Sequence, residues 1–297
     1  MSSDAPEARF GLHLNQPGKS WTEIIRDFQL AEDLGFDTAW LSDHLLSTEG
    51  TDDGAILEAW TLLAAIAALT SRIRLGILVT SNTFRHPALL AKQAVTVDHV
   101  SGGRLILGLG AGWREDEHRR YGLDFPQAPV RVDRLEETVR ILHALMGQKL
   151  TTFSGRHYDL DEAPFEPKPI QRPRIPILIA AHQPRMIRIA ARYADQWDTF
   201  STQPGTSTSW TTEDVGSRMR RFEAACTDAG RDPAAIRRST TPATNVFSSE
   251  AAFVDFVHEC RTLGFTDFIA EPPPGSEERV RRIAETTIPA LRAELRT

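Results

Sequence analysis

The hydrophobic positions of this chain form short continuous runs that alternate with longer amphipathic segments. The runs IRLGILVT, from Ile73, and RLILGLG, from Arg104, are almost entirely apolar, as expected for strands covered on both faces of a parallel sheet. Between them, PALLAKQAVTVDHV begins with Pro87, which the first turn of a helix tolerates, and ends before a Ser-Gly-Gly break. The pattern predicts a strand, a helix and a second strand in succession.

The same alternation recurs eight times along the chain. The predicted strands are Phe10–Leu14, Asp37–Ser42, Ile73–Thr80, Arg104–Leu109, Ile175–Ala180, 195–200, Ile236–Phe247 and Phe265–Ala270. The predicted helices are Trp21–Leu34, Ile56–Leu69, one begun by Pro87, Arg131–Met146, Pro184–Tyr193, Thr212–Ala229, Ser249–Leu263 and Ser276–Leu295, with a short acidic helix between the fourth strand and Arg131–Met146. Eight alternating units favour an α/β fold of the (β/α)8 TIM-barrel class over an open sheet.

One stretch departs from the minimal unit. Residues 150–174 contain four prolines and little periodicity, which predicts a long connection between the fourth helix and the fifth strand. No linker suggests a second domain, so a single domain is expected over residues 1–297.

Composition and charge exclude several function classes. The net charge of -6 and the scattered basic residues leave no electrostatic footprint for nucleic acid. The longest apolar run, Leu62–Leu69, is too short to span a membrane, and the N-terminus lacks a signal-peptide pattern, so a cytoplasmic location is expected. Cys226 and Cys260 have no metal-ligand spacing and are expected to be buried free thiols.

In a barrel, functional groups follow the carboxyl ends of the strands. The best acid/base candidate at these positions is Asp43-His44, since histidine titrates near neutrality and a nearby polar group can fix its tautomer. The alternative is a helix-capping aspartate followed by a surface histidine. The run from Glu115 to His118 is interpreted as a solvated helix start rather than a metal site, because consecutive helical residues point in different directions.

The glycines at the end of the fourth strand allow a planar ligand to approach the backbone closely. Gly108, Gly110 and Gly112 are spaced GxGxG, not GxGxxG, so a dinucleotide site of the Rossmann type is not expected. Neither GxSxG nor HExxH occurs in the chain.

Three segments carry a family resemblance: GFDTAWLSDH, the stretch from TSRIRLGILVTSNTF through GRLILGLGAGWREDEHRRYG, and IPILIAAHQPRMIRIAARYADQWDTF. Together they resemble the luciferase-like monooxygenase superfamily, and within it the branch that uses the deazaflavin coenzyme F420. The resemblance implies an F420-dependent oxidoreductase that moves a hydride between the deazaflavin C5 and a small organic substrate, with His44 handling the coupled proton. An FMN-dependent monooxygenase and a catalytically silent flavin-binding barrel are the alternatives, and the resemblance leaves a homodimer open.

The resemblance also implies which residues form the site. His44 and Asp43 would face the deazaflavin ring, and Leu78-Val79 would form a non-proline cis peptide behind it. The implied cofactor contacts are Asp43, Leu78, Val79, Thr80, Asn82, Thr83, Gly110, Ala111, Gly112, Asp116, Ala181, His182 and Gln183. Positions after the strands that would meet the substrate are Asn15, Trp113 and Ser201, and no metal is expected.

Two departures from the family pattern matter. Trp113 stands where sugar-phosphate-oxidising relatives carry an acidic glutamate, which argues against that substrate class. Ala181-His182-Gln183 replaces a glycine-rich loop that wraps the cofactor phosphate, so His182 or Arg185 would have to contact it instead. The polar loop 201–210 is either a substrate lid or a surface loop.

Overall fold

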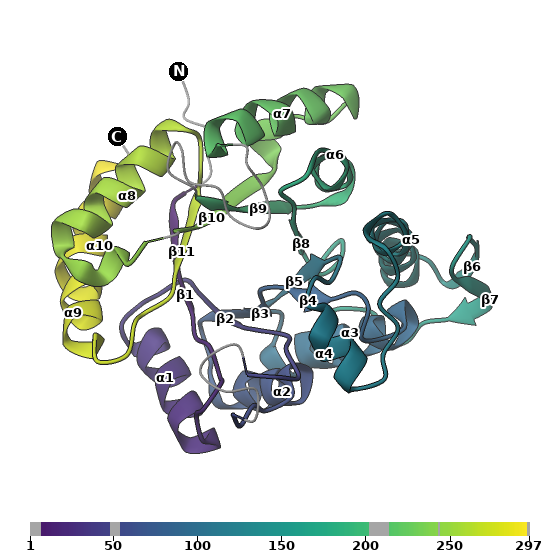
Figure 1. Ribbon diagram of the computed structural model, residues 1–297, viewed down its shortest axis with the longest axis horizontal. Helices are drawn as coiled ribbons and strands as arrows, with labels where there is room; N and C mark the ends of the chain where they lie inside the picture. Colours follow the sequence, from purple (N-terminus) through teal and green to yellow (C-terminus); the bar gives the residue numbers. More distant parts are fainter. Residues whose placement is uncertain (1–6, 48–53, 202–213, 243, 296–297) are drawn as a thin grey trace. The chain divides into compact units, whose positions relative to one another are not determined.

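The computed structural model describes residues 7–47, 54–201, 214–242 and 244–295 (Figure 1). These residues form two compact units. The first comprises Met1–Asn15, Arg26–Trp40 and Leu178–Thr297, and the second comprises Gln16–Ile25 and Leu41–Ile177. The expectation of one domain over the whole chain stays a prediction.

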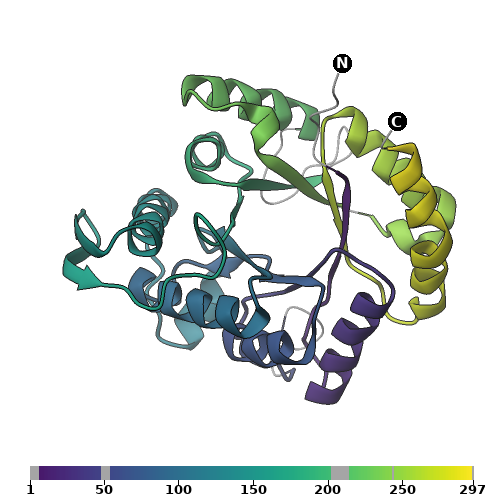
Figure 2. The ribbon, with the colours of Figure 1, turned by 180° about the vertical axis from the view of Figure 1, so that it is seen from behind.

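The first unit is a parallel sheet with helices following its strands. Its strands are β1 (Arg9–His13), β2 (Thr38–Leu41), β8 (Ile177–Ala180), β9 (Gln196–Ser201), β10 (Arg237–Pro242) and β11 (Asp267–Ala270), in the order β2-β1-β11-β10-β9-β8. Its helices are α1 (Trp21–Asp33, which begins in the second unit), α6 (Pro184–Tyr193), α7 (Val215–Asp228), α8 (Glu250–Thr262), α9 (Glu277–Arg282) and α10 (Ile288–Glu294). Both Figure 1 and Figure 2 show α8, α9 and α10 along one side of β11.

The second unit contains the chemistry-bearing loops. Its strands are β3 (Arg74–Ile77), β4 (Thr80–Ser81) and β5 (Leu105–Gly110), and its helices are α2 (Ala59–Leu69), α3 (Pro87–Ser101), α4 (Glu115–Arg120) and α5 (Ala128–Gly147). Both β3 and β4 pair with β5 in parallel, Leu75 opposite Leu105 and Thr80 opposite Leu109. The side chains of β5 are buried throughout, which explains its continuous hydrophobic pattern.

Eight strand-helix units follow one another in the described chain, with β3 and β4 together supplying the third strand. Within each unit, the described strand pairings of the main sheet are all parallel. This succession is that of the (β/α)8 barrel and confirms the predicted fold class. Pro87 begins α3 as predicted, and Gly102, with φ of 67°, ends it.

The third strand is interrupted where the family resemblance implies a break. The peptide bond between Leu78 and Val79 is cis, as expected. It separates β3 from β4 and brings the polar residues of β4 to the end of the broken strand. The N–H of Leu78 donates to the carbonyl of Leu41 at 2.8 Å, which links this break to the end of β2.

The long connection after α5 is more ordered than predicted. It contains an antiparallel hairpin of β6 (Leu150–Ser154) and β7 (Asp159–Pro164), beside α5 in Figure 1. The exposed and buried positions of β7 alternate poorly, so the local pattern did not indicate a strand. The buried carboxylate of Glu137 on α5 stabilises the turn by accepting three backbone N–H groups, those of residues 156, 157 and 158.

Two predicted elements, one strand and one helix, are shorter or less regular in the structure than expected. The predicted strand Ile236–Phe247 ends at Pro242, because a proline and a short 3-10 turn at Val246–Ser248 end the ladder. The final predicted helix is interrupted by a π-helical turn at Ile283–Thr287. The predicted start of the helix Thr212–Ala229 lies outside the described residues, and the carboxylate of Asp214 caps α7.

Candidate functional site

The loop after β2 is tied to the loop after β4 by the buried side chain of Asp43. Its carboxylate accepts a hydrogen bond from the N–H of Ser81 at 2.8 Å and two from the guanidinium of Arg85 at 2.5 and 3.0 Å. Both oxygens are therefore used by protein groups, in the bidentate geometry that fixes an arginine firmly. These contacts hold the end of β2 in place, and the expected position of Asp43 beside a cofactor ring stays a prediction.

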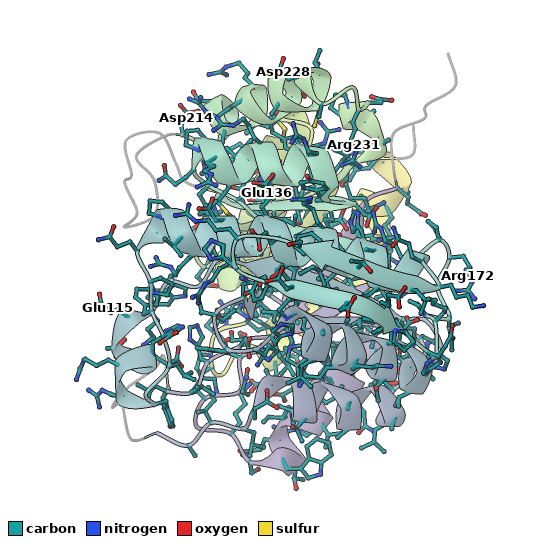
Figure 3. The ribbon with its side chains drawn as sticks, turned by 90° about the vertical axis from the view of Figure 1, so that its right-hand side faces the viewer. Glu115, Glu136, Arg172, Asp214, Asp228 and Arg231 are labelled. Carbon is teal, nitrogen blue, oxygen red and sulfur yellow. The ribbon has the colours of Figure 1, made fainter. Side chains whose placement is uncertain are left out.

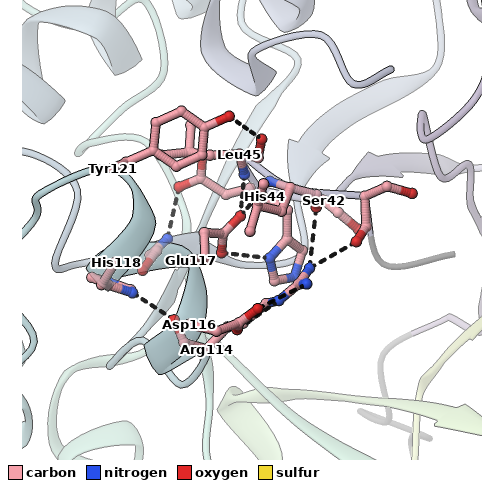
Figure 4. Close-up of polar contacts among 12 residues, drawn as sticks. Ser42, His44, Leu45, Arg114, Asp116, Glu117, His118 and Tyr121 are labelled. Atoms are coloured by element: carbon pink, nitrogen blue, oxygen red, sulfur yellow. Dashed lines mark hydrogen bonds and ion pairs between the residues drawn. The ribbon is translucent and has the colours of Figure 1, made fainter. Parts of the chain in front are cut away.

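His44 is held by a residue that the sequence did not single out. Its Nδ1 lies 3.0 Å from Oε2 of Glu117 on α4. The other carboxylate oxygen of Glu117 accepts hydrogen bonds from the backbone N–H groups of Leu45 and Leu46, the second at 2.8 Å. One carboxylate thus holds both the ring of His44 and the backbone that follows it (Figure 4).

The acidic run on α4 divides into exposed and buried halves. Glu115 is exposed and points away from the helix toward solvent (Figure 3), but the side chain of Glu117 is 1% exposed. The interpretation of this run as a solvated helix start is therefore right for Glu115 and wrong for Glu117 and for the equally buried His118. Burial alone would raise the pKa of Glu117, but hydrogen bonds from His44, Leu46 and Leu45 outweigh it, so this pKa is lowered and the carboxylate stays ionised.

The backbone around His44 has further anchors. Arg114 donates to the carbonyls of Leu46 at 3.2 Å and Ser47 at 2.9 Å, and the hydroxyl of Tyr121 donates to the carbonyl of Leu45 at 3.1 Å (Figure 4). These contacts immobilise the loop without touching the imidazole ring.

Two predicted ligand contacts lie beside this loop. The indole of Trp113, half-exposed, meets the ring of His44 edge-on with centroids 5.6 Å apart. Asp116 pairs with Arg114 at 3.0 Å near the surface, which lowers the pKa of its carboxyl. The expected contact of Asp116 with a ribityl chain stays a prediction, since its carboxylate is engaged by this arginine.

Thr83 belongs to a chain of polar contacts. Its hydroxyl lies 2.6 Å from Nε2 of His118 and 2.8 Å from the hydroxyl of Ser81, and Nδ1 of His118 lies 2.7 Å from the carbonyl of Arg114. A carbonyl can only accept, so Nδ1 of His118 carries the proton and Nε2 of the neutral ring accepts from Thr83. The Thr83 hydroxyl therefore donates its hydrogen bond to His118 within the protein.

The side chains of Asn82 and Thr80 differ from that of Thr83 in their hydrogen bonding. Asn82 is 2% exposed and Thr80 is fully buried. Neither the two side-chain polar atoms of Asn82 nor the hydroxyl of Thr80 has a hydrogen-bond partner in the described chain. Buried polar atoms are almost always paired, so these three atoms are available for hydrogen bonds to a bound polar group.

The glycines of β5 make room first for the broken strand. A Cβ on Gly108 would lie 2.1 Å from the carbonyl oxygen of Ile77, and one on Gly110 would lie 2.5 Å from Cγ2 of Val79. Close packing of β5 against the cis peptide region explains both glycines without a ligand. The expected contacts of Gly110 and Ala111 with a cofactor stay predictions.

In the first unit, the loop after β8 surrounds a buried histidine. The Nδ1 of His182 lies 2.9 Å from the hydroxyl of Thr199, and its ring stacks on Phe200 with centroids 5.0 Å apart. The fully buried guanidinium of Arg218 donates to Thr199 and to the carbonyl of Phe200, at 2.6 Å for the carbonyl. Burial, together with the charge of Arg218, lowers the pKa of His182 to about 4, so the imidazole is neutral at pH 7.

The other expected residues of this loop are backbone-anchored. The N–H of Ala181 donates to the carbonyl of Asp198 at 2.9 Å, and the carbonyl of Ala181 accepts from the indole of Trp197 at 2.9 Å. Gln183 is the N-cap residue of α6. Whether Ala181, His182 and Gln183 contact a phosphate stays a prediction.

The predicted substrate contacts of the first unit are only partly described. Asn15 donates to Oε1 of Glu271 at 2.6 Å, which joins the ends of β1 and β11. Ser201 is the last residue of β9, and residues 202–210 of the predicted lid lie outside the described residues.

Local sequence patterns do not identify three residues that hold the candidate site residues in place. Glu117 lies 73 residues from His44, and Arg218 lies 36 residues from His182, so no local spacing connected them. Arg85 lies just before a predicted helix, where an arginine is ordinarily solvated. A count of charged residues after each strand would find Arg85 and Glu117, but it would not show that they pair with Asp43 and His44.

Metal and membrane sites have no support in the part of the chain that is described. No three His, Cys, Asp or Glu side chains there are grouped so as to hold a metal ion. Among the same residues, no helix has the length and apolar character needed to cross a membrane. Cys226 and Cys260 are both buried, as expected, and neither forms a disulfide within the described residues.

Comparison with known proteins gives both a family and a set of relatives. The sequence profile of the luciferase-like monooxygenase family matches residues 7–293. An F420-dependent glucose-6-phosphate dehydrogenase of Microbacterium testaceum is 34% identical over 194 residues, which cover 65% of this chain and 56% of that protein. A phthiodiolone/phenolphthiodiolone dimycocerosates ketoreductase of a Mycobacterium species is 35% identical over 208 residues, 69% of this chain and 51% of that protein. The match thus spans little more than half of these relatives.

Solved structures extend the likeness to nearly the whole chain. An F420-dependent secondary alcohol dehydrogenase in complex with an F420-acetone adduct superposes with a TM-score of 0.80 at 19% identity, covering 94% of this chain and 98% of that one. An F420-dependent tetrahydromethanopterin reductase from Methanopyrus kandleri gives a TM-score of 0.80 at 20% identity, covering 96% and 99%. At this identity the likeness concerns the fold, and it agrees with the strand-helix succession described above.

Proposed function

The chain belongs to the luciferase-like monooxygenase family, and from this premise we propose that it is an F420-dependent oxidoreductase acting on a small organic substrate. One relative, 34% identical over the aligned residues, is named as an F420-dependent enzyme. The observation that carries the proposal is the unpaired polar pair of Thr80 and Asn82, buried at the end of β4.

The chemistry of this pair suits the edge of a deazaflavin ring. An asparagine amide offers donors and an acceptor, and a threonine hydroxyl offers both roles, which matches the alternating N–H and C=O groups of a pyrimidine edge. We infer that Thr80 and Asn82 hold the pyrimidine edge, with Gly112 as a further contact of the coenzyme.

The coenzyme supplies a hydride donor or acceptor at C5, and the protein supplies orientation, exclusion of water and a proton. In this proposal His44 is the group that accepts or donates the coupled proton, at Nε2, because Nδ1 is occupied by Glu117. Asp43 and Arg85 keep the loop of His44 in register with β4.

The surroundings of His44 favour an uncharged substrate. The charged side chains described at this loop are already engaged: Asp43 pairs with Arg85, Arg114 pairs with Asp116, and the Glu117 carboxylate accepts hydrogen bonds from His44, Leu45 and Leu46. Trp113 adds an aromatic surface where a sugar-phosphate site would need an acid. We therefore propose a neutral ketone, aldehyde or activated alkene as substrate, or the corresponding alcohol in the reverse direction.

The cofactor assignment is tested by titrating the purified protein with F420 and, separately, with FMN. We expect F420 to bind at least about tenfold more tightly, a difference of about 1.4 kcal/mol. The matched variant Asn82→Leu removes the polar edge at similar volume and should weaken F420 binding by a comparable factor. Tight FMN binding without F420 binding would instead favour a flavin-dependent monooxygenase on the same fold.

The role of His44 is tested by His44→Gln, assayed as oxidation of reduced F420 by a panel of neutral carbonyl compounds. We expect kcat to fall by about 10²- to 10⁴-fold, the usual range for loss of a general acid or base, while the Kd for F420 changes less than about threefold. Unchanged turnover would remove His44 from the proton transfer. Coenzyme binding with no turnover of any substrate by the wild-type protein would indicate a silent binding barrel.

A further inference from the structure

The carboxylate of Glu117 contacts both the ring of His44 and the backbone N–H groups of Leu45 and Leu46, which follow it. We propose that Glu117 is a positioning residue, which fixes the tautomer and orientation of His44 so that the imidazole lone pair stands on Nε2. The inference rests on the proposed role of His44 in proton transfer and names a second residue on which that role depends.

The geometry of this contact shows which nitrogen of the neutral His44 ring carries the hydrogen. The Nδ1 of His44 lies 3.0 Å from Oε2 of Glu117, and Oε1 accepts from the N–H groups of Leu45 and Leu46. An ionised carboxylate has no proton to donate, so the short contact with Nδ1 requires the hydrogen to be on the imidazole. Neutral His44 therefore has Nε2 unprotonated, and Nε2 is the atom able to accept a proton from a reacting alcohol.

The environment of Glu117 keeps its carboxylate in the ionised form that this function needs. The side chain is 1% exposed, and an unpaired charge there would be unfavourable. Three hydrogen bonds to the carboxylate compensate for burial, and they lower the pKa of Glu117 despite the loss of water. The same negative charge stabilises the imidazolium when His44 holds the proton, as a buried carboxylate does behind a catalytic histidine.

Other residues also anchor the backbone of this loop. Tyr121 reaches the carbonyl of Leu45, and Arg114 reaches those of Leu46 and Ser47. Trp113 borders the ring edge-on but offers it no ionised group. The loop could therefore keep its course without Glu117, whereas the tautomer of His44 could not be fixed in the same way. This difference separates a positioning role from a purely structural one.

The first test is the protonation of His44 in the wild-type protein, read by ¹⁵N NMR of labelled histidine without coenzyme. The proposal expects a protonated Nδ1 and an unprotonated Nε2 in neutral His44, assigned by loss of the signal in His44→Gln. The opposite tautomer would overturn the proposal, and this measurement does not depend on any Glu117 variant being folded.

The second test compares Glu117→Gln with Tyr121→Phe. An amide in place of Glu117 can present N–H groups to Nδ1 and so favours the wrong tautomer. We expect a mixed or reversed tautomer and a fall in kcat on the order of 10²-fold or more, with the Kd for F420 within about threefold of wild type. Tyr121→Phe removes one anchor of the same loop and should leave both the tautomer and kcat close to wild type.

A third variant, Glu117→Asp, and the possible negative results for Glu117→Gln also test the proposal. Glu117→Asp restores the charge at greater distance, and partial recovery of kcat together with the wild-type tautomer supports the proposal. A Glu117→Gln variant with unchanged tautomer and unchanged kcat overturns it. If the tautomer reverses but kcat does not change, the positioning role stands, and it is the proposed proton transfer by His44 that fails.

Discussion

At the scale of single residues, two glycines show how one backbone conformation has different consequences. Gly112 and Gly122 both have positive φ, 82° and 68°, a region in which side chains other than glycine are disfavoured. Around Gly122 there is open space, whereas a Cβ on Gly112 would lie 2.6 Å from the hydroxyl of Thr83 and 3.1 Å from that of Ser81. The glycine after β5 therefore serves packing as well as conformation.

Alanine substitution at these two positions separates the two effects. Gly122→Ala should destabilise the protein by about 1 kcal/mol, the conformational penalty alone. Gly112→Ala should cost about 2–4 kcal/mol, because the added methyl also displaces the Thr83 and Ser81 hydroxyls that lead to His118. Denaturant unfolding measures both, and equal losses for the two variants would contradict the packing explanation.

At the scale of elements, one arginine joins the end of α2 to the end of α3. Arg104, just before β5, donates to the carbonyls of Ala67 and Thr70 and to the hydroxyl of Thr70, all near the end of α2. It also donates to the carbonyl of Ser101 at 2.8 Å, and to that of Ile73 at 2.7 Å. Helix ends leave carbonyls without partners, and here a single planar guanidinium serves several of them.

Arg104→Lys should therefore be a severe change despite conserving charge. An ammonium group cannot reproduce the planar fork, so buried carbonyls at the helix ends lose their partners, at a cost of about 2–4 kcal/mol. The control is Arg119→Lys on the exposed face of α4, for which we expect a change within about 0.5 kcal/mol. Comparable unfolding midpoints for the two variants would show that Arg104 does not hold these elements together.

At the scale of the whole molecule, two buried groups of the first unit give stability opposite dependences on pH. Burial raises the pKa of Asp198 to about 7, with Asp267 adding to the shift and the Ser239 hydrogen bond and Arg218 opposing it. The folded state therefore holds a proton that the unfolded state releases near pH 4, and this contribution to stability is lost as pH rises through about 7. His182, with its pKa lowered to about 4, contributes stability above pH 6.5 that is lost as pH falls toward 4.

The two effects oppose each other between about pH 4 and 6.5, and single substitutions should reveal each one. Relative to wild type, Asp198→Asn should gain stability with rising pH, by up to about 1.4 kcal/mol per pH unit in this window. His182→Gln should show the reverse slope, and the double variant should lie between them. Unfolding midpoints measured from pH 4 to 8 provide the comparison, and profiles parallel to wild type in both variants would refute the assignment.

The arrangement of the strands and helices was largely predictable because it depends on local pattern. Apolar runs, Pro87 at a helix start and glycines such as Gly102 at helix ends act within a few residues, so the order of the eight units followed from the sequence. The hairpin at 150–164 was missed because its turn is held by Glu137, a residue on the preceding helix whose carboxylate meets distant N–H groups. The cytoplasmic location and the open question of a homodimer stay predictions.

The sequence by itself determined the order of the strand-helix units, the family and the place of the cis peptide, and it singled out His44 as a candidate for proton transfer. Only the tertiary structure decided that Glu117 holds His44, that Asp43 is committed to Arg85, and that Asn82 has unpaired polar atoms. The reason is physical: periodicity reports which face of an element is buried, while the partner of a buried charge is chosen across the fold by distance and desolvation.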